Sequence, residues 1–330
     1  MTGIKSNEIT VSVFCITYEH VRYIAQAIES FLMQKTNFLF EIVIGEDCSK
    51  DGTREIVLEY AQKYPDLIRV ITSENNVGAI ENEIRTFKAC KGKYIAFCEG
   101  DDFWLDPDKL QKQVDFLESN KDYAICFHPV FIYKEGQERK LSSLNQSTVE
   151  VSYTIEDIVK KNIIHTPSVV FRNVLDGNLP GWFSDSPIGD YVLHVLHAIH
   201  GKIKYLPEPM AVYRLHAGGT FSNLNQRDVL LKSIKVIDLL QSENFVIEVA
   251  TLLEEQKRKL VNELLELNLK SNWNLTQFVC DLNYAMDDKI LMKIWLTKRL
   301  PEEINDLRNS RSFHLGQKIS NIYKFISFKK

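Results

Sequence analysis

The chain has 330 residues and a formal net charge of -4 at pH 7, with 45% hydrophobic and 25% charged residues. This composition is ordinary for a globular protein with a sizeable core, and the length predicts one large domain with an appendage or two domains. The negative charge excludes a general nucleic-acid binder, because such proteins need a basic face.

Cysteine spacing and hydropathy indicate the compartment. The six cysteines are irregularly spaced and form no CxxC pair, which favours a reducing environment over a disulfide framework. The first eight residues are polar, and no run approaches the roughly 20 apolar residues of a membrane-spanning helix. We therefore expect a cytoplasmic protein. Any association with the inner face of the cell membrane would be peripheral.

Short apolar runs alternate with amphipathic segments over the first 105 residues. The predicted strands are residues 9–16, 41–45, 67–71 and 93–98, and the predicted helices begin near residues 24, 54 and 79 and after residue 106. This alternation predicts parallel strands joined by right-handed crossovers. The carboxyl ends of such strands share one edge of the sheet, so the four loops that follow them should converge on one crevice. These loops contain Thr17, Asp47, Asn76 and Glu99.

The fourth strand runs into FCEGDDFW, residues 97–104, which holds three carboxylates within four residues. Crowded acids at a strand end repel one another, and a hard divalent cation would relieve the repulsion while sharing its coordination with a phosphate. Gly100 permits a turn and the close approach of a ligand. The stretch predicts a metal-diphosphate site; the alternative is that Asp101 and Asp102 only begin a surface turn.

Two further features support the metal-diphosphate interpretation. Asp106 and Pro107 predict the start of a helix, which puts the acids in a strand-to-helix loop. Neither GxGxxG nor GxxxxGK[ST] occurs in the chain. Without a glycine-rich cradle, the charge of the phosphates would have to be met by the cation.

The second half shows weaker signals. We expect a long strand over residues 123–133, a polar loop over 134–148, a short helix opening near 153, and strands over 169–171 and 210–214. Gly189 and Asp190 precede a predicted amphipathic helix, and the chain is helical by pattern from Gln226 onward.

Six segments of residues 9–220 together resemble the family 2 glycosyltransferases. They are the opening strand with Thr17-Tyr18, EDCSKDGT at 46–53 (similar to DDGSxDGT), Asn76-Val77-Gly78 with Asn82, KGKYI running into EGDDFW, IGDY at 188–191, and YRLHAGG at 213–219. One departure is that the usual DxD is here Glu99-Gly100-Asp101, and the longer arm of glutamate favours Asp101 over Glu99 as the direct metal ligand.

The resemblance implies an α/β protein with the GT-A fold: a Rossmann-like mixed sheet flanked by helices, with a C-terminal helical appendage. The glycosyltransferase domain would cover residues 1–225, with a nucleotide-binding half at 9–105 and an acceptor half at 106–225. The helical C-terminal region would cover 226–330.

The resemblance also implies roles for individual residues on the donor side. Asp47 would accept a hydrogen bond from the nucleotide base, and Asp101 and His216 would hold a divalent metal, Mn²⁺ or Mg²⁺. For Asp51 we instead expect a local role, as the cap of the following helix, because Asp is common before helices for capping reasons alone. The residues implied to bind the nucleotide sugar are Thr17, Tyr18, Glu19, Asp47, Asn76, Gly78, Glu99, Gly100, Asp101 and Arg214.

On the acceptor side, the resemblance implies contacts through Trp104, His165 and Thr166, although a purely structural role for His165 stays open. Asp190 is the implied general base, because a sugar hydroxyl is a poor nucleophile until a carboxylate accepts its proton. The alternative for Asp190 is that it only caps the helix.

We therefore expect a metal-dependent, inverting glycosyltransferase of the hexosyltransferase class. It would move a sugar from a nucleotide-diphosphate donor, UDP-linked for preference, to a hydroxyl of a glycan or lipid-linked acceptor in bacterial-type surface polysaccharide synthesis. The alternatives are a catalytically inert module that binds sugar nucleotides or glycans, and a nucleotidyltransferase. The latter would be expected to carry a glycine- and arginine-rich loop near its first strand, which residues 16–23 lack.

The C-terminal third carries no catalytic motif. An apolar stripe that includes Leu253, Leu260 and Leu264 predicts a helical appendage or a homo-oligomer surface. Residues 311–330 contain five basic and no acidic residues, with apolar residues at helical spacing. This pattern fits a basic helix lying on an anionic membrane, or a helix packed on its own domain.

Overall fold

The computed structural model describes residues 8–144, 146–219, 223–270 and 280–281. The chain divides into two compact units, Met1–Ser222 and Asn223–Lys330. The predicted basic helix at 311–330 lies outside the described residues.

A large mixed sheet forms the centre of the first unit. Its parallel half has the order β3-β2-β1-β4, which confirms the predicted parallel strands. These strands are β1 (Val11–Thr17), β2 (Phe40–Glu46), β3 (Ile68–Ile71) and β4 (Tyr94–Phe97). The sheet continues from β4 through β10 (Val170–Arg172), β6 (Tyr123–Phe127), β11 (Lys202–Tyr205) and β9 (Val151–Tyr153), with β10 antiparallel to both neighbours.

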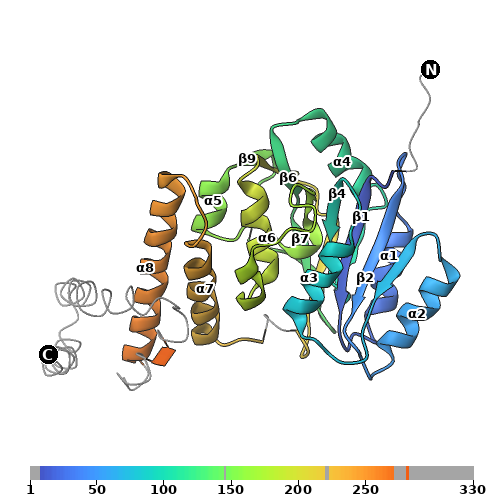
Figure 1. Ribbon diagram of the computed structural model, residues 1–330, viewed down its shortest axis with the longest axis horizontal. Coiled ribbons are helices and arrows are strands. Elements are labelled where there is room, and N and C mark those ends of the chain that lie inside the picture. The colour runs from blue at the N-terminus through green and yellow to red at the C-terminus, as the bar shows by residue number, and fades with distance from the viewer. Residues whose placement is uncertain (1–7, 145, 220–222, 271–279, 282–330) are drawn as a thin grey trace, which may run out of the picture. The chain divides into compact units, whose positions relative to one another are not determined.

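Helices cover both faces of the parallel half, with α3 in front of the strands and α1 behind them in Figure 1. Val13 and Cys15 of β1 belong to the same apolar cluster as Phe31 of α1, whereas Phe14 stacks edge-on against Phe87 of α3. Burial on both faces explains why these strands read as continuous apolar runs rather than as alternating patterns. The helices of this unit are α1 (Ile24–Leu32), α2 (Thr53–Lys63), α3 (Ala79–Ala89), α4 (Lys109–Ser119), α5 (Ile155–Lys160) and α6 (Gly189–Ala198).

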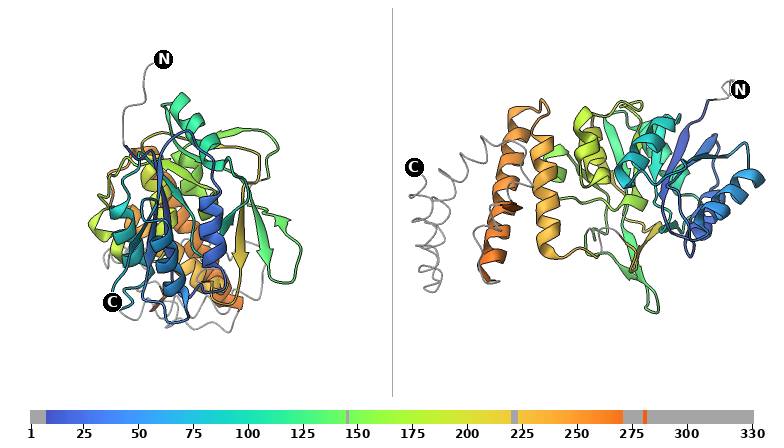
Figure 2. Two further views of the ribbon diagram at one scale, coloured as in Figure 1. Left: turned by 90° about the vertical axis from the view of Figure 1, so that its right-hand side faces the viewer. Right: turned by 60° about the horizontal axis from the view of Figure 1, so that its bottom comes forward.

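A smaller sheet has the order β5-β12-β7-β8, and Figure 2 shows β12 beside the green strands β7 and β8. Its strands are β5 (Phe103–Trp104), β7 (Val130–Lys134), β8 (Lys140–Leu141) and β12 (Ala211–Leu215). The single strand predicted over 123–133 is therefore wrong. The run divides into β6 and β7, which belong to different sheets, because Pro129 lacks the N–H that a continuous ladder needs. The predicted polar loop over 134–148 likewise contains β8.

Two short segments lead into the elements that carry the site. The helix predicted at Asp106-Pro107 begins later, at Lys109, because Asp106 accepts the N–H of Asp108 at 2.8 Å and closes a turn first. A 3₁₀ turn, η1 (Thr166–Ser168), precedes β10, and another, η2 (Gly181–Asp185), precedes α6.

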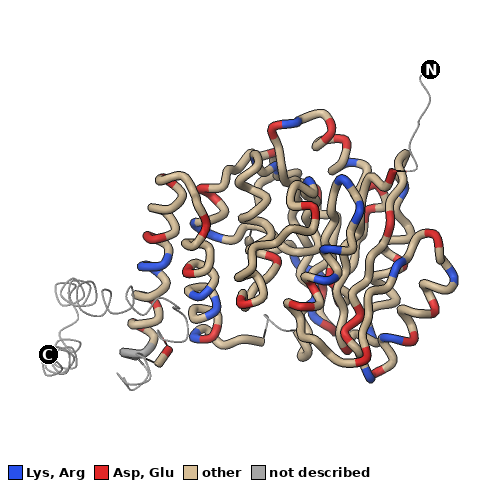
Figure 3. The backbone as a smooth tube through the Cα atoms, viewed as in Figure 1, with Lys and Arg blue, Asp and Glu red and all other residues tan. Residues whose placement is uncertain are grey.

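The second unit contains α7 (Gln226–Leu240) and α8 (Ile247–Lys270), so the helical pattern predicted from Gln226 is confirmed for these residues. The side chain of Asn225 accepts the N–H of Asp228 and caps α7. Within the described ranges, each helix is too short or too polar to cross a membrane. Figure 3 shows basic and acidic residues interspersed along the described chain.

Candidate functional site

The loops that follow the parallel strands meet at one edge of the large sheet, as predicted. The N–H of Gly100 donates to the carbonyl of Ile16 at 2.9 Å, which joins the loop after β4 to the end of β1. The N–H of Asp47 donates to the carbonyl of Thr17, and the Asn76 side chain donates to the carbonyl of Asp47. These bonds connect all four loops.

Gly100 allows the loops after β1 and β4 to approach closely. A Cβ atom at this position would lie 2.6 Å from Oγ1 and 2.7 Å from Cβ of Thr17. Such contacts are too short for any side chain. Substitution at Gly100 would therefore separate the acidic stretch from the first loop.

Asp101 lies against two histidines. Its Oδ2 atom is 2.8 Å from Nε2 of His216 and 3.7 Å from Nε2 of His20. The three side chains offer ligand atoms that all lie within 4.8 Å of one another. His216 and Asp101 are both predicted metal ligands, whereas no sequence pattern points to His20.

The three acids of the stretch differ in the direction in which their surroundings shift the pKa. Burial and the neighbouring carboxylates raise the pKa of Glu99 and of Asp102 well above their usual values. Burial acts in the same direction on Asp101, but the hydrogen bond with His216 and the charge of His20 outweigh it and lower the pKa of Asp101. Asp101 is therefore the member of the cluster that stays ionised, and burial lowers the pKa of His20, which favours its neutral form.

The residues present fit a divalent cation. Glu99, Asp101 and Asp102 place carboxylate oxygens within 4.8 Å of one another. Oδ1 of Asp101 and Oδ2 of Asp102 are buried and have no hydrogen-bond partner among the described residues. Buried, unpaired carboxylate oxygens are costly unless a cation or a donor meets them.

Arg214 fixes the acidic stretch through hydrogen bonds from its backbone and its side chain. Its backbone N–H donates to Oδ1 of Asp102 at 2.8 Å, and its guanidinium donates to the carbonyl of Asp101 and to Gln26. The same guanidinium lies over the Phe103 ring, 4.4 Å from its centre. The side chain thus fixes the position of the acids, and its predicted contact with the donor stays a prediction.

Asp47 organises the loop after β3. It is 2% exposed and accepts the N–H groups of Val77 at 2.8 Å and Gly78 at 2.9 Å. Gly78 has a φ of 89°, which favours glycine. The predicted bond from Asp47 to a nucleotide base stays a prediction and would have to be added to these contacts.

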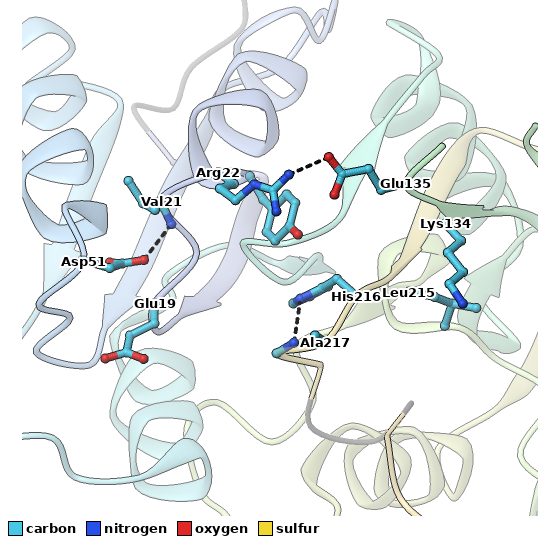
Figure 4. A pocket seen from close by; sticks show the side chains of 11 residues that line it. Glu19, Val21, Arg22, Asp51, Lys134, Glu135, Leu215, His216 and Ala217 are labelled. Atoms are coloured by element: carbon cyan, nitrogen blue, oxygen red, sulfur yellow. Dashed lines mark hydrogen bonds and ion pairs between the residues drawn. The ribbon is translucent and has the colours of Figure 1, made fainter. Parts of the chain in front are cut away.

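A pocket of about 440 Å³ opens beside His216 (Figure 4). Glu19, Tyr23 and His216 line it, and an ion pair between Arg22 and Glu135 borders it. The predicted helix cap Asp51 also lines this pocket, and its carboxylate accepts the N–H groups of Thr53 and Val21. Tyr18, predicted to line the nucleoside pocket, is 43% exposed.

Asp190 lies in the first turn of α6 and is held in a defined orientation. Its Oδ2 accepts the Thr166 hydroxyl at 2.8 Å, and its Oδ1 accepts the N–H of Tyr191 at 2.7 Å. The residue that precedes the helix is Ile188, so Asp190 is not the N-cap. The charge of Asp190 contributes to the raised pKa of Glu99, which places Asp190 within electrostatic reach of the acidic stretch.

His165 has structural contacts. Its Nε2 lies 2.7 Å from the Ser142 hydroxyl, and its ring centre lies 5.3 Å from that of Tyr213. Burial lowers its pKa to about 4, so the ring is neutral at physiological pH. An acceptor contact through His165 stays a prediction.

The expectation that Trp104 binds the acceptor is wrong. Trp104 is 1% exposed, its ring packs against Phe31, and Lys109 lies 4.3 Å above its centre. The indole N–H donates to the carbonyl of Pro167 at 2.9 Å. A side chain enclosed in this way is part of the core and offers no face to a sugar.

Glu83 is a neighbour of Asp190 that the sequence did not reveal. A Cβ atom at Gly189 would lie 1.9 Å from Oε2 of Glu83, so the Glu83 carboxyl group fills the space beside this glycine. Burial and then the charge of Asp190 raise the pKa of Glu83 well above its usual value. Glu83 belongs to α3, and only the packing of α3 near the start of α6 brings it here.

Comparison with known proteins gives a consistent result. The family model described as "Glycosyl transferase family 2" matches residues 12–176. An uncharacterised protein of Mycobacterium tuberculosis is 39% identical over 214 residues, which are 63% of this chain and 60% of that relative. A Bacillus subtilis protein, TuaG, named provisionally as a teichuronic acid biosynthesis glycosyltransferase, is 37% identical over 107 residues, 32% of this chain and 41% of its own. The chain thus spans about 60% of the length of the Mycobacterium relative.

Two solved structures share the fold. One is S. aureus TarS 1-349 in complex with UDP, with a TM-score of 0.61, 18% identity, and coverage of 84% of this chain and 80% of that one. The other is the mannosyltransferase PcManGT of Pyrobaculum calidifontis in complex with GDP-Man and Mn²⁺, with a TM-score of 0.54, 13% identity, and coverage of 98% and 82%. This likeness confirms the predicted mixed-sheet GT-A fold.

Proposed function

The chain belongs to glycosyl transferase family 2, and on this premise we propose that it transfers a sugar from a nucleotide-diphosphate donor to a hydroxyl group of an acceptor glycan or lipid-linked glycan. UDP-sugars are the donors we favour, and surface polysaccharide synthesis is the context we favour. The UDP complex of TarS and the name of the TuaG relative support these two choices.

One observation carries the proposal. The Asp190 carboxylate, which the Thr166 hydroxyl holds in place, lies close enough to act electrostatically on a partly buried acidic cluster suited to a divalent cation. Transfer of a glycosyl group needs a base for the acceptor hydroxyl and a positive charge at the departing diphosphate, at separate places in one site.

The residues divide the work as follows. Asp190 accepts the proton of the acceptor hydroxyl while its oxygen attacks the anomeric carbon from the face opposite the diphosphate, and this single displacement inverts the configuration. Thr166 keeps the Asp190 carboxylate oriented. Asp101 and His216 would hold a divalent cation, and Arg214 would keep Asp101 in place. When bound, the cation supplies Lewis acidity that stabilises the leaving diphosphate.

The donor site is tested by isothermal titration of the protein with UDP, with and without Mn²⁺, beside Asp101→Ala. We expect UDP binding that depends on the metal and that the variant loses. If UDP fails to bind in both conditions, the UDP assignment is wrong, and GDP- and dTDP-linked donors take its place in the same titration.

The base is tested by turnover with Asp190→Asn. Because the amide cannot accept the proton, we expect the rate to fall on the order of 10² to 10⁴ while the affinity for UDP is unchanged. A variant that turns over at the wild-type rate would exclude Asp190 as the base. A wild-type protein that binds donor but neither transfers nor hydrolyses it would favour a binding module instead.

A further inference from the structure

We propose that His20 is a third protein ligand of the divalent cation, with Asp101 and His216, and that the two imidazoles make this site select a first-row transition ion over Mg²⁺. This inference rests on the proposed function, because it concerns the cation of the same site. It adds a ligand that the family resemblance did not imply and a choice of ion that the acidic stretch alone leaves open.

The distances fit simultaneous ligation. Two ligand atoms at right angles on a cation about 2.1 Å from each lie about 3 Å apart. Nε2 of His216 is 2.8 Å and Nε2 of His20 is 3.7 Å from Oδ2 of Asp101. The two rings are nearly perpendicular, at 86°, with centres 5.9 Å apart, so both can present a nitrogen to one point.

His20 is held in the orientation that ligation needs. Its other nitrogen, Nδ1, lies 3.2 Å from the Thr17 hydroxyl, which leaves Nε2 directed at Asp101. A hydrogen bond to the second nitrogen is the usual means by which a metal-binding histidine is fixed. Thr17 in turn packs against Gly100. The glycine next to Asp101 therefore also helps to fix the position of His20 relative to Asp101.

The backbone on either side of His20 is held in a defined turn. Glu19 has a φ of 54°, a left-handed conformation that is uncommon for residues other than glycine. Its N–H donates to the Ser49 hydroxyl at 3.0 Å, and the N–H of Val21 donates to Asp51 at 3.0 Å. Two bonds from the loop after β2 thus flank His20 and hold this turn.

The set of ligands decides the ion. Mg²⁺ demands oxygen ligands and keeps much of its water, whereas imidazole nitrogen binds first-row transition ions with an affinity that rises from Mn²⁺ to Co²⁺. Two histidines and one carboxylate also leave coordination positions for phosphate oxygens. Ligation through His216 requires its proton to move to Nδ1, which now accepts the N–H of Gly218 at 3.2 Å, so this turn must adjust.

The test is calorimetric titration of the full chain with Mn²⁺, Co²⁺ and Mg²⁺ at fixed pH, without donor. We expect the affinity to increase in the order Mg²⁺, Mn²⁺, Co²⁺. His20→Ala should lower the Mn²⁺ affinity at least about 10-fold and leave the Mg²⁺ affinity within about 2-fold. His200→Ala, which removes an exposed histidine, is the matched control and should behave like wild type.

A second variant and a spectroscopic measurement separate loss of a metal ligand from loss of protein stability. His20→Asp replaces nitrogen with oxygen, so it should lower the ratio of Mn²⁺ to Mg²⁺ affinity even if the protein is less stable. Pulsed electron paramagnetic resonance of bound Mn²⁺ should detect two coordinated imidazole nitrogens in wild type and one in His20→Ala.

Three results would overturn the inference. They are a single coordinated imidazole in the wild-type spectrum, a Mn²⁺ affinity of His20→Ala within about 2-fold of wild type, or a parallel fall in Mg²⁺ affinity. If Asp101→Ala abolishes Mn²⁺ binding while His20→Ala does not, the proposed cation site stands and only the role of His20 fails. If wild type binds no cation, both are wrong.

Discussion

The Thr166 hydroxyl donates to Oδ2 of Asp190 at 2.8 Å, across a separation of 24 residues in the sequence. Thr166 begins the 3₁₀ turn before β10, whereas Asp190 lies in the first turn of α6. The bond therefore connects two elements. Oδ2 of Asp190 accepts the hydroxyl of a side chain, and Oδ1 accepts the backbone N–H of Tyr191. A proposed base held at both oxygens has a fixed direction.

We expect Thr166→Val to lower kcat about 10- to 100-fold, since a hydrogen bond to a charged group contributes about 1.5–3 kcal/mol. The affinity for UDP should not change, because Thr166 is predicted to contact the acceptor and not the donor. Thr166→Ser keeps the hydroxyl and should recover most of the activity in the same steady-state assay. If serine fails to recover it, the methyl group rather than the hydrogen bond is what matters.

Gly189→Ala should destabilise the protein by about 1–3 kcal/mol, because the added Cβ would lie 1.9 Å from Oε2 of Glu83. Shortening the acid in Glu83→Ala/Gly189→Ala should recover part of this loss, which a double-mutant cycle in denaturant measures as coupling. Gly181→Ala is the control, since the position of its Cβ is open. Additive effects of the two substitutions would show that Glu83 does not occupy this space.

Trp104→Ala should lower the free energy of unfolding by about 3–5 kcal/mol, because the indole is 1% exposed and packs against Phe31. Trp104→Phe should cost less, since it keeps one aromatic ring in the core, although it loses the rest of the indole and its bond to Pro167. Denaturant unfolding measures both. A large rise in the acceptor KM of Trp104→Phe at unchanged stability would return Trp104 to the acceptor site.

Lys109 imposes a pH-dependent cost on folding. It is fully buried, Nζ has no hydrogen-bond partner in the described part of the chain, and burial lowers its pKa to about 7. Because the folded-state pKa is below that of the unfolded chain, the unfolded chain binds more protons between about pH 7 and 10. The cost is therefore fully present below pH 7 and disappears as the pH rises towards 10.5.

We expect Lys109→Met to raise the free energy of unfolding by on the order of a few kcal/mol at pH 7 and by about 1 kcal/mol or less at pH 10. The lost contact of the ammonium with Trp104 offsets about 1 kcal/mol of this gain. Chemical unfolding at the two pH values measures the difference, with Lys88→Met, at an exposed position, as the control. An equal gain at both pH values would mean that the amine is not neutral in the folded protein.

The sequence by itself determined the elements and the edge of the sheet that carries the site. Apolar runs of four to seven residues between amphipathic segments specify β1 to β4 and their helices, because local periodicity records which faces are buried. The strand-helix rhythm then makes the strands parallel and brings their loops together. The three acids and the one glycine of residues 97–104 could be recognised as a candidate site without the tertiary structure.

Only the tertiary structure decided which side chains face one another. His20 reaches Asp101 because β1 pairs with β4 and Gly100 lets the two loops touch, and Glu83 reaches Gly189 through the packing of α3 near α6. Trp104 follows the acidic stretch directly, yet β5 turns it into the core. Periodicity describes one element at a time, whereas these contacts depend on strand order and on space between elements, which no local pattern encodes.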